Sequence, residues 1–191
     1  LAALLDPEDL QAVIGDYHAA VTAAVSAHDG YVAHLLGDGV LVYFGYPHAN
    51  EDDAARAVRA ALGVVAAVGR LAAGGRHALR ARIGIATGLV VVGQIGSGAL
   101  AAELSVSGET PNLAARLQTH ATPDSIVIAD RTRRLVGEEF ELHALGALEL
   151  GGDDREAGAG GLPRSGDDRA KAPSPVRRDA GVQGAVRPGR A

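Results

Sequence analysis

The sequence lacks three residue types that support common chemistries. Among its 191 residues there is no cysteine, no methionine and no tryptophan. The absence of cysteine excludes disulfides, zinc sites built on thiolates and cysteine nucleophiles. Lysine occurs once, at Lys171, so no chemistry that requires a lysine can be placed before that residue. Because methionine does not begin the chain, we expect the natural start to lie upstream of Leu1.

Other features are scarce, and their scarcity argues against several classes of partner. Aromatic residues make up 3% of the sequence, too few for a surface that stacks the bases of single-stranded nucleic acid. The formal net charge of −5 opposes binding to a phosphate backbone. The longest apolar run, Ala60–Gly69, has about half the length of a membrane-spanning helix, and no signal-peptide pattern opens the chain. We therefore expect a cytoplasmic protein that binds neither nucleic acid nor membranes.

Composition changes sharply near Leu150. Residues 151–191 consist largely of glycine, proline, arginine and aspartate, with very few branched aliphatic side chains. Such a segment cannot bury enough apolar surface to offset the entropy lost on ordering. The sequence therefore predicts a folded domain over residues 1–150 and a disordered segment over residues 151–191.

Within the first 150 residues, helical and strand patterns alternate, with Asp6 and Asn50 as the expected N-caps of two helices. The strands are joined partly by hairpins rather than by strict crossover units, which favours an α+β fold with a mixed sheet backed by helices. Helices are expected over 7–29, 50–75, 111–117 and 130–136, and strands over 31–36, 40–44, 79–87, 89–92, 103–106, 125–129, near Phe140 and over 145–150.

The first candidate site is the segment Gly37-Asp38-Gly39, which joins two strands. A carboxylate at a hairpin tip, between glycines that allow other groups to approach closely, suits a hard divalent cation and its phosphate ligand. Asp-Gly is also a favoured filler of tight hairpin turns, so the pattern alone leaves a purely structural role open.

Two pairs of polar residues are candidates for anion binding. Asn112 and Arg116, four apart on a helix, share one face and offer an amide and a guanidinium to a single anionic centre. Arg80 and Arg82 share one face of a strand. Either pair could equally be a solvated surface. The segment 93–98 lacks the consecutive lysine and serine or threonine of a phosphate-binding loop, and we predict that it is a flexible loop.

The order and context of these segments are more specific than any one of them. They are Leu35–Pro47 followed by Glu51–Ala54, then Arg82–Gly88, then Gly108–Leu117. In this order they resemble the catalytic domain of class III adenylate and guanylate cyclases, in the variety found beside ATPase regions in large bacterial regulators. The resemblance runs from about Leu4 to Leu150. It implies a ferredoxin-like α+β domain that dimerises head to tail and converts a nucleoside triphosphate to the 3′,5′-cyclic monophosphate and pyrophosphate.

The resemblance also implies roles for individual residues. Asp38 matches the second of two aspartates that bind two Mg²⁺ or Mn²⁺ ions, which would activate the ribose 3′-hydroxyl and neutralise the triphosphate. Arg82 matches an arginine that holds the terminal phosphates. Asn112 would orient the ribose and Arg116 would stabilise charge on the α-phosphate, both acting from the partner subunit.

The chain departs from the family pattern at four places. The other metal-binding aspartate belongs to a strand before the first helix, where this chain has not yet begun, and no lysine follows the last aliphatic strand. His34 stands where the family has a purine-selecting lysine, and Ser105 where it has the partner of that lysine. Both can hydrogen-bond a purine, but neither selects adenine over guanine by charge, whereas Gly37 and Gly39 are expected to contact the substrate beside Asp38. The association of this bacterial variety with cyclic AMP makes ATP the expected substrate.

Two alternatives to an active cyclase remain at this point. One is a non-catalytic cyclase-like module that binds a nucleotide or a partner and regulates an attached ATPase. The other, a metal-dependent phosphohydrolase, would need an additional cluster of acidic or histidine ligands, which the sequence does not show. Because of the departures above, we expect reduced activity from this chain by itself.

Overall fold

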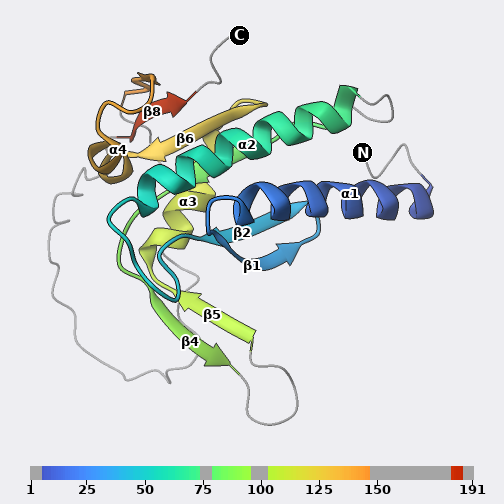
Figure 1. Cartoon of the computed structure of the whole chain (residues 1–191), viewed down its shortest axis with the longest axis horizontal. Helices are drawn as coiled ribbons and strands as arrows, with labels where there is room; N and C mark the ends of the chain where they lie inside the picture. The colour runs from blue at the N-terminus through green and yellow to red at the C-terminus, as the bar shows by residue number, and fades with distance from the viewer. Residues whose placement is uncertain (1–5, 74–78, 96–102, 147–181, 187–191) are drawn as a thin grey trace, which may run out of the picture.

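The computed structural model describes residues 6–73, 79–95, 103–146 and 182–186, and its helices and strands form an α+β fold, as predicted (Figure 1). The elements follow one another in this order: α1 (Pro7–Ser26), β1 (Tyr31–Leu36), β2 (Gly39–Tyr43), α2 (Asp53–Ala73), β3 (Arg82–Ile85), β4 (Val91–Ile95), β5 (Glu103–Ser107), α3 (Glu109–His120), β6 (Ser125–Ala129), α4 (Asp130–Val136), β7 (Leu142–His143) and β8 (Val182–Val186).

The strands form three small sheets instead of the single mixed sheet that the sequence predicts. β1 pairs with β2, β4 pairs with β5, and a four-stranded sheet has the order β3-β6-β8-β7. β3 and β6 are parallel, with Arg82 beside Ser125 and Ile85 beside Ile128. In the described part of the chain β2 pairs only with β1 and β3 only with β6, so each has one unpaired edge.

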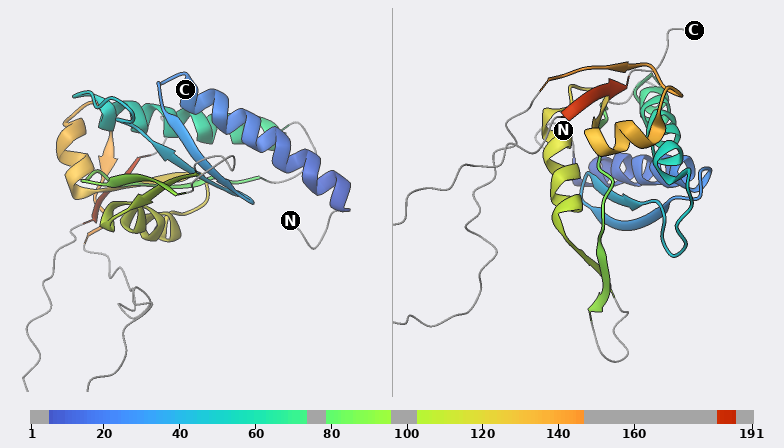
Figure 2. Two further views of the ribbon diagram at one scale, coloured as in Figure 1. Left: turned by 90° about the horizontal axis from the view of Figure 1, so that it is seen from below. Right: turned by 90° about the vertical axis from the view of Figure 1, so that its left-hand side faces the viewer.

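The core lies on both faces of β6, which is buried along its whole length. α2 covers one face and α3 covers the other, as the two views of Figure 2 show. Alternate residues of the strand face opposite layers, as the pleat requires. Ile126 and Ile128 join a cluster with α1 and α2, whereas Val127 and Ala129 pack with Leu117 and Ala121 of α3 and the residue that follows it.

α2 buries a stripe of small apolar side chains. Val58, Ala61, Val65 and Val68 follow the three- and four-residue spacing of one helix face, and all four are buried. Its many alanines favour the helix intrinsically. The small side chains let α1 and α2 lie side by side, and together they form the layer that supports the β1–β2 hairpin (Figures 1 and 2).

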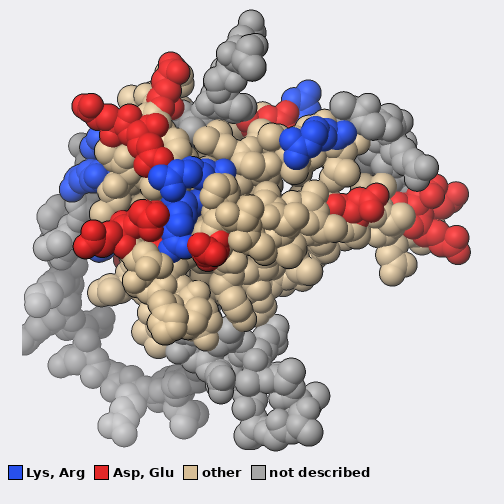
Figure 3. All heavy atoms as spheres, viewed as in Figure 1, with Lys and Arg blue, Asp and Glu red and all other residues tan. Residues whose placement is uncertain are grey.

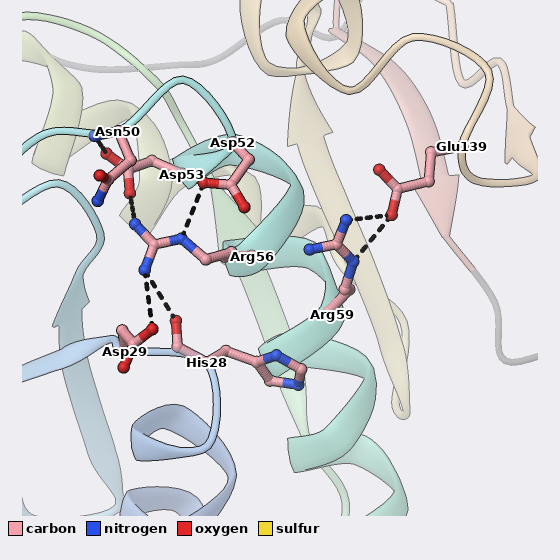
Figure 4. A network of polar contacts seen from close by, with 8 residues as sticks. All are labelled: His28, Asp29, Asn50, Asp52, Asp53, Arg56, Arg59 and Glu139. Atoms are coloured by element: carbon pink, nitrogen blue, oxygen red, sulfur yellow. Dashed lines mark hydrogen bonds and ion pairs between the residues drawn. The ribbon is translucent and has the colours of Figure 1, made fainter.

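Arg56 ties the start of α2 to the end of α1 (Figure 4). Its guanidinium forms ion pairs with Asp52, Asp53 and Asp29, and its Nη1 atom lies 3.4 Å from the carbonyl oxygen of His28. Asp52 and Asp53, at the N-terminus of α2, are therefore partners of the same arginine as Asp29. On the face shown in Figure 3, arginines lie beside acidic side chains and do not form a continuous basic surface.

The two predicted N-caps have different outcomes: Asp6 is at the N-cap position of α1, whereas α2 begins three residues after Asn50. α2 is helical from Asp53, and the Asp53 carboxylate accepts the backbone N–H of Asn50 at 2.7 Å, the contact that a capping box makes from its third helical position. Asp6 precedes α1 with extended backbone angles, but its side chain makes no capping hydrogen bond.

Four predictions about strands and loops are corrected. Gly93–Ile95 belongs to β4 rather than to a loop, because its backbone pairs with β5 from Glu103 to Ser105; residues 96–98 lie outside the described residues. β3 is shorter than the predicted 79–87, and residues 145–146 are not in a strand. The strand expected near Phe140 begins later, at Leu142. The helix expected over 111–117 is present and longer, and β6 and α4 have the predicted bounds.

The prediction of disorder over 151–191 is wrong for Val182–Val186. These residues form β8, which pairs antiparallel with both β6 and β7. The segment is locally apolar, and its backbone satisfies the free edge of β6, which composition averaged over the whole segment does not reveal. The boundary at residue 150 lies outside the described residues and stays a prediction. None of the described helices has the length and apolar character needed to cross a membrane.

Candidate functional site

Asp38 lies at the tip of the β1–β2 hairpin, as the sequence predicts. Leu36 pairs with Gly39, which leaves Gly37 and Asp38 as a two-residue loop. Gly37 has a φ of +60°, whereas Asp38 is not among the described residues with positive φ. This combination is the type II′ turn, in which glycine occupies the first loop position. The turn exposes the Asp38 side chain to solvent beside Gly39.

A cavity of about 340 Å³ lies beside this turn. It is lined by Asp38, Gly39, Arg82, Gln118 and Thr119. Within the part of the chain that the structure describes, neither the Asp38 carboxylate nor the Arg82 guanidinium forms an ion pair. An acidic group that can bind a cation and a basic group that can bind an anion therefore border the same space without neutralising partners.

Arg80 and Arg82, which the sequence predicts on one face of a strand, have different environments in the structure. Arg80 pairs with Asp124, whose other carboxylate oxygen accepts the backbone N–H of Ala81 at 3.2 Å. Arg82 has no such partner among the described residues and lines the cavity. The alternation along the strand is as predicted, with Ala81 buried between two exposed arginines. Only Arg82 is available to bind an anion there.

Gly84 brings the end of α3 to the cavity. A Cβ atom on Gly84 would lie 2.5 Å from the backbone nitrogen of Gln118, far inside van der Waals contact. Helix α3 therefore rests directly on the backbone of β3. This contact places Gln118 and Thr119 opposite Asp38, although both residues are distant from it in the sequence.

Sequence reasoning missed Gln118 and Thr119. They follow Arg116 closely on the same helix, and the Thr119 hydroxyl donates to the Arg116 carbonyl oxygen at 2.7 Å. The one signal in the sequence was the presence of two polar side chains near the end of this helix. The local pattern did not indicate that they line the same cavity as Asp38.

The structure does not bring the remaining predicted residues into this cavity. Asn112 and Arg116 are exposed on α3, and neither lines the cavity. His34 is half-buried on β1, opposite Leu41. Ser105 lies on β5, where its backbone is opposite Gly93.

Two residues of α1 also reach the Asp38 turn, and sequence reasoning assigned them no role in the site. Burial, and in second place the negative charge of Asp38, raise the pKa of the Tyr17 phenol above its ordinary value. The Nε2 atom of His18 lies 2.9 Å from the carbonyl oxygen of Gly37. Both side chains are half-buried, and their rings are neighbours with centroids 5.5 Å apart.

The comparison with known families agrees with this geometry. Residues 1–159 match the sequence model of the family described as the adenylate and guanylate cyclase catalytic domain. This chain belongs to that family. The resemblance drawn from its three motifs is confirmed, and the chain is a class III nucleotide cyclase domain.

The similar proteins include one named as an adenylate cyclase and one named as a guanylyl cyclase. A Rhizobium meliloti (strain 1021) protein described as uncharacterized is 33% identical over 150 residues, which cover 78% of this chain and 14% of that protein. Adenylate cyclase 1 of the same strain is 33% identical over 116 residues, 59% of this chain and 17% of that protein. The crystal structure of the guanylyl cyclase Cya2 superposes with a TM-score of 0.72 at 28% identity, covering 97% of this chain and 83% of that one.

The identities and coverages of these matches limit what can be transferred to this chain. The fold of the cyclase domain agrees with a solved cyclase structure, which confirms the predicted fold class. The chain spans 14% and 17% of the lengths of the two Rhizobium relatives, so activities of those whole proteins do not transfer directly. Because one similar protein is called an adenylate cyclase and another a guanylyl cyclase, family membership does not determine whether the substrate is ATP or GTP.

Proposed function

We propose that this cyclase domain converts ATP to 3′,5′-cyclic AMP and pyrophosphate, and that its active sites form between two copies of the domain arranged head to tail. The observation that carries the proposal is the cavity that Asp38 and Arg82 share without ion-pair partners in the described chain. A nucleoside triphosphate with a divalent cation supplies both charges that this space lacks.

Asp38 is suited to a Mg²⁺ or Mn²⁺ ion. Its carboxylate provides the hard oxygen ligand that these ions prefer, and Gly37 and Gly39 beside it add no side chain that would hinder the approach of a phosphate. Among the described residues no three potential ligands cluster, and Asp38 is the one carboxylate that lines the cavity. A bound cation would neutralise the triphosphate and lower the pKa of the attacking 3′-hydroxyl.

Arg82 contributes by binding the terminal phosphates. In the reaction the ribose 3′-oxygen forms a bond to the α-phosphorus, its proton leaves, and the bond from that phosphorus to the β-phosphate breaks to release pyrophosphate. A guanidinium on the β- and γ-phosphates holds the triphosphate for this attack and stabilises the charge that develops on the leaving group. Gln118 and Thr119 add an amide and a hydroxyl to the same wall.

Asn112 and Arg116 complete the site from the partner subunit in this proposal. Both side chains are exposed on α3 and lie outside the cavity of their own chain, which suits residues that act on the substrate of another copy. Exposed apolar residues at the start of β4, Leu89 at 90% and Val91 at 72% exposure, also favour burial in an assembly.

The choice of ATP rests on the association of this bacterial cyclase variety with cyclic AMP and on the similarity to an adenylate cyclase. His34 and Ser105 would contact the purine. The supply of ATP and Mg²⁺ inside cells makes the cytoplasm the expected location. A non-catalytic regulatory module is the second candidate, favoured because Asp38 is the one carboxylate among the described residues that line the cavity and because no lysine precedes Lys171.

The test is a product assay on the intact protein that contains this chain. The protein is supplied with Mn²⁺ and either ATP or GTP, the products are separated, and triphosphate binding is measured in parallel, with Asp38→Ala as the control. Cyclic AMP formed by the wild type and not by the control supports the proposal. Preferential formation of cyclic GMP would show that the purine assignment is wrong. Binding without any product would favour the regulatory module.

A further inference from the structure

The hydrogen bond between α1 and the hairpin tip has a consequence for Asp38. His18 Nε2 lies 2.9 Å from the Gly37 carbonyl oxygen, across 19 residues of sequence. A carbonyl oxygen only accepts, so the imidazole donates through Nε2. Gly37 lies in the loop between the paired residues Leu36 and Gly39, where the strand ladder offers its carbonyl no donor.

The carbonyl of Gly37 belongs to the same planar peptide group as the N–H of Asp38. Turns of types I′ and II′ both have positive φ at the first loop residue, and they differ in the orientation of this central peptide. Rotating the peptide would change φ of Asp38 from negative to positive. Aspartate is one of the few residues that tolerate a positive φ, so the sequence Gly37-Asp38 permits both turns.

We propose that His18 is a positioning residue that holds the Gly37–Asp38 peptide in the observed orientation and thereby keeps the Asp38 carboxylate at the cavity where the divalent cation binds. The inference rests on the proposed function, because it assigns Asp38 to that cation. His18 touches neither substrate nor metal and acts only through the turn.

The surroundings of His18 suit such a role. The ring of Tyr17 lies next to the imidazole, and Tyr17 itself packs against the main core cluster. Both residues belong to α1, which is anchored in that cluster by the buried side chains of Val21 and Val25. The donor is therefore attached to a rigid element, whereas the acceptor lies in an exposed two-residue loop with a glycine on each side of Asp38.

Nuclear magnetic resonance of the full chain tests the effect on the turn without any activity measurement. His18→Phe keeps an aromatic ring but has no donor, His18→Gln restores an N–H donor, and His48→Phe is the control at an exposed loop position. We expect the amide resonances of residues 37–39 to broaden or split in His18→Phe. They should stay close to wild type in the other two variants. Unchanged resonances in His18→Phe would overturn the inference.

Manganese binding tests the consequence for the cation. Paramagnetic broadening of the same amides is followed during Mn²⁺ titration of the chain, and the Mn²⁺ dependence of turnover is measured in the intact protein. Loss of one hydrogen bond that holds the ligand should raise the Mn²⁺ concentration needed by about three- to ten-fold, with kcat at saturating Mn²⁺ changed by less than about two-fold. His18→Gln should recover most of the loss.

The outcomes separate this inference from the proposed function. If Asp38→Ala abolishes Mn²⁺ broadening while His18→Phe leaves the Mn²⁺ dependence unchanged, Asp38 is the metal ligand and the positioning role of His18 is wrong. If Asp38→Ala binds Mn²⁺ as the wild type does, the proposed metal site fails, and the role of His18 fails with it. A lower kcat in His18→Phe at unchanged Mn²⁺ dependence would also contradict the inference.

Discussion

A Cβ atom on Gly84 would lie 2.1 Å from the carbonyl oxygen of Ala114, so β3 and α3 meet backbone to backbone at this residue. This contact sets the height of α3 above the sheet. It places the end of the helix, with Gln118 and Thr119, at the cavity that contains Asp38. The lack of a side chain at Gly84 therefore helps to set the position of two residues that line the candidate site.

Replacing Gly84 by alanine should push α3 away from β3. Gly84 does not have a positive φ, so the effect is steric rather than conformational. We expect the free energy of unfolding to fall by about 1–3 kcal/mol, measured by urea denaturation. The control is Gly69→Ala on the exposed face of α2, where an added Cβ meets nothing within 4 Å. That change should stabilise the protein by about 0.5–1 kcal/mol. Equal effects of the two variants would contradict the close contact.

Arg80 and Arg82 form a matched pair for testing phosphate binding. Arg82→Ala should raise the KM for the nucleoside triphosphate about ten- to a hundred-fold, because a charged hydrogen-bond donor to the phosphates is lost. Arg80→Ala removes an ion pair with Asp124 whose arginine is 63% exposed, so it should lower stability by at most about 1 kcal/mol and leave KM nearly unchanged. Steady-state kinetics of the intact protein measure both. An equal rise in KM in both variants would assign phosphate binding to the shared face of the strand rather than to Arg82.

A shared site predicts complementation between inactive subunits. Asp38→Ala should remove the metal ligand from its own site, and Arg116→Ala should remove the catalytic arginine from the partner's site, so neither variant turns over alone. When the two are mixed, about half of the dimers combine both variants, and each of these has one intact site. Activity should then recover to roughly a quarter of wild type, as two-fold symmetry requires. An inactive mixture that sizing and labelling show to contain mixed dimers would exclude action of Arg116 across the interface.

The alkaline stability of the chain should depend on Tyr17. Its pKa is raised by burial and by the charge of Asp38, so the protonated phenol favours the folded state below the ordinary tyrosine pKa. This contribution is lost as the pH rises through the raised pKa. Urea unfolding measured from about pH 9 to pH 11 should show a smaller loss of stability in Tyr17→Phe than in wild type.

Asp38→Asn independently tests the effect of the Asp38 charge on the pKa of Tyr17. Removing the charge should lower the pKa of Tyr17 toward its ordinary value while burial keeps it raised. The difference in tyrosinate absorbance between Asp38→Asn and the double variant Asp38→Asn/Tyr17→Phe isolates this group. A Tyr17 titration that is the same with and without the carboxylate would show that the two side chains do not interact.

Local features of the fold follow from short stretches of sequence. The hairpin with Asp38 at its tip, the bounds of β6 and α4, and the start of α1 beside Pro7 depend on turn chemistry and periodicity among neighbouring residues, and all of them agree with the prediction. The turn itself is one residue shorter than predicted, because Gly39 already belongs to β2. The family assignment also came from the sequence, because three motifs in a defined order are specific even where each one is weak.

The strands that were predicted wrongly depend on partners elsewhere in the chain. Gly93–Ile95 reads as a glycine-containing loop by composition, yet it is a strand because β5 supplies hydrogen bonds to its backbone. Val182–Val186 lies in a segment with little apolar surface, yet it pairs with β6 and β7. In both cases pairing with another strand decides the structure, and the composition of the segment itself does not show that pairing.

For the candidate site, short stretches of sequence are enough to predict the residue types: a carboxylate at a hairpin tip, an arginine on a strand, and an amide and an arginine on one helix face. The folded chain is needed to see that Asp38 and Arg82 share a cavity, that Asp124 pairs with Arg80 rather than Arg82, and that His18 of α1 contacts the turn. The physical reason is that residue type and spacing depend on a few adjacent bonds. Which charge remains unpaired depends on close contacts between distant elements, such as the approach of α3 to β3 that Gly84 permits.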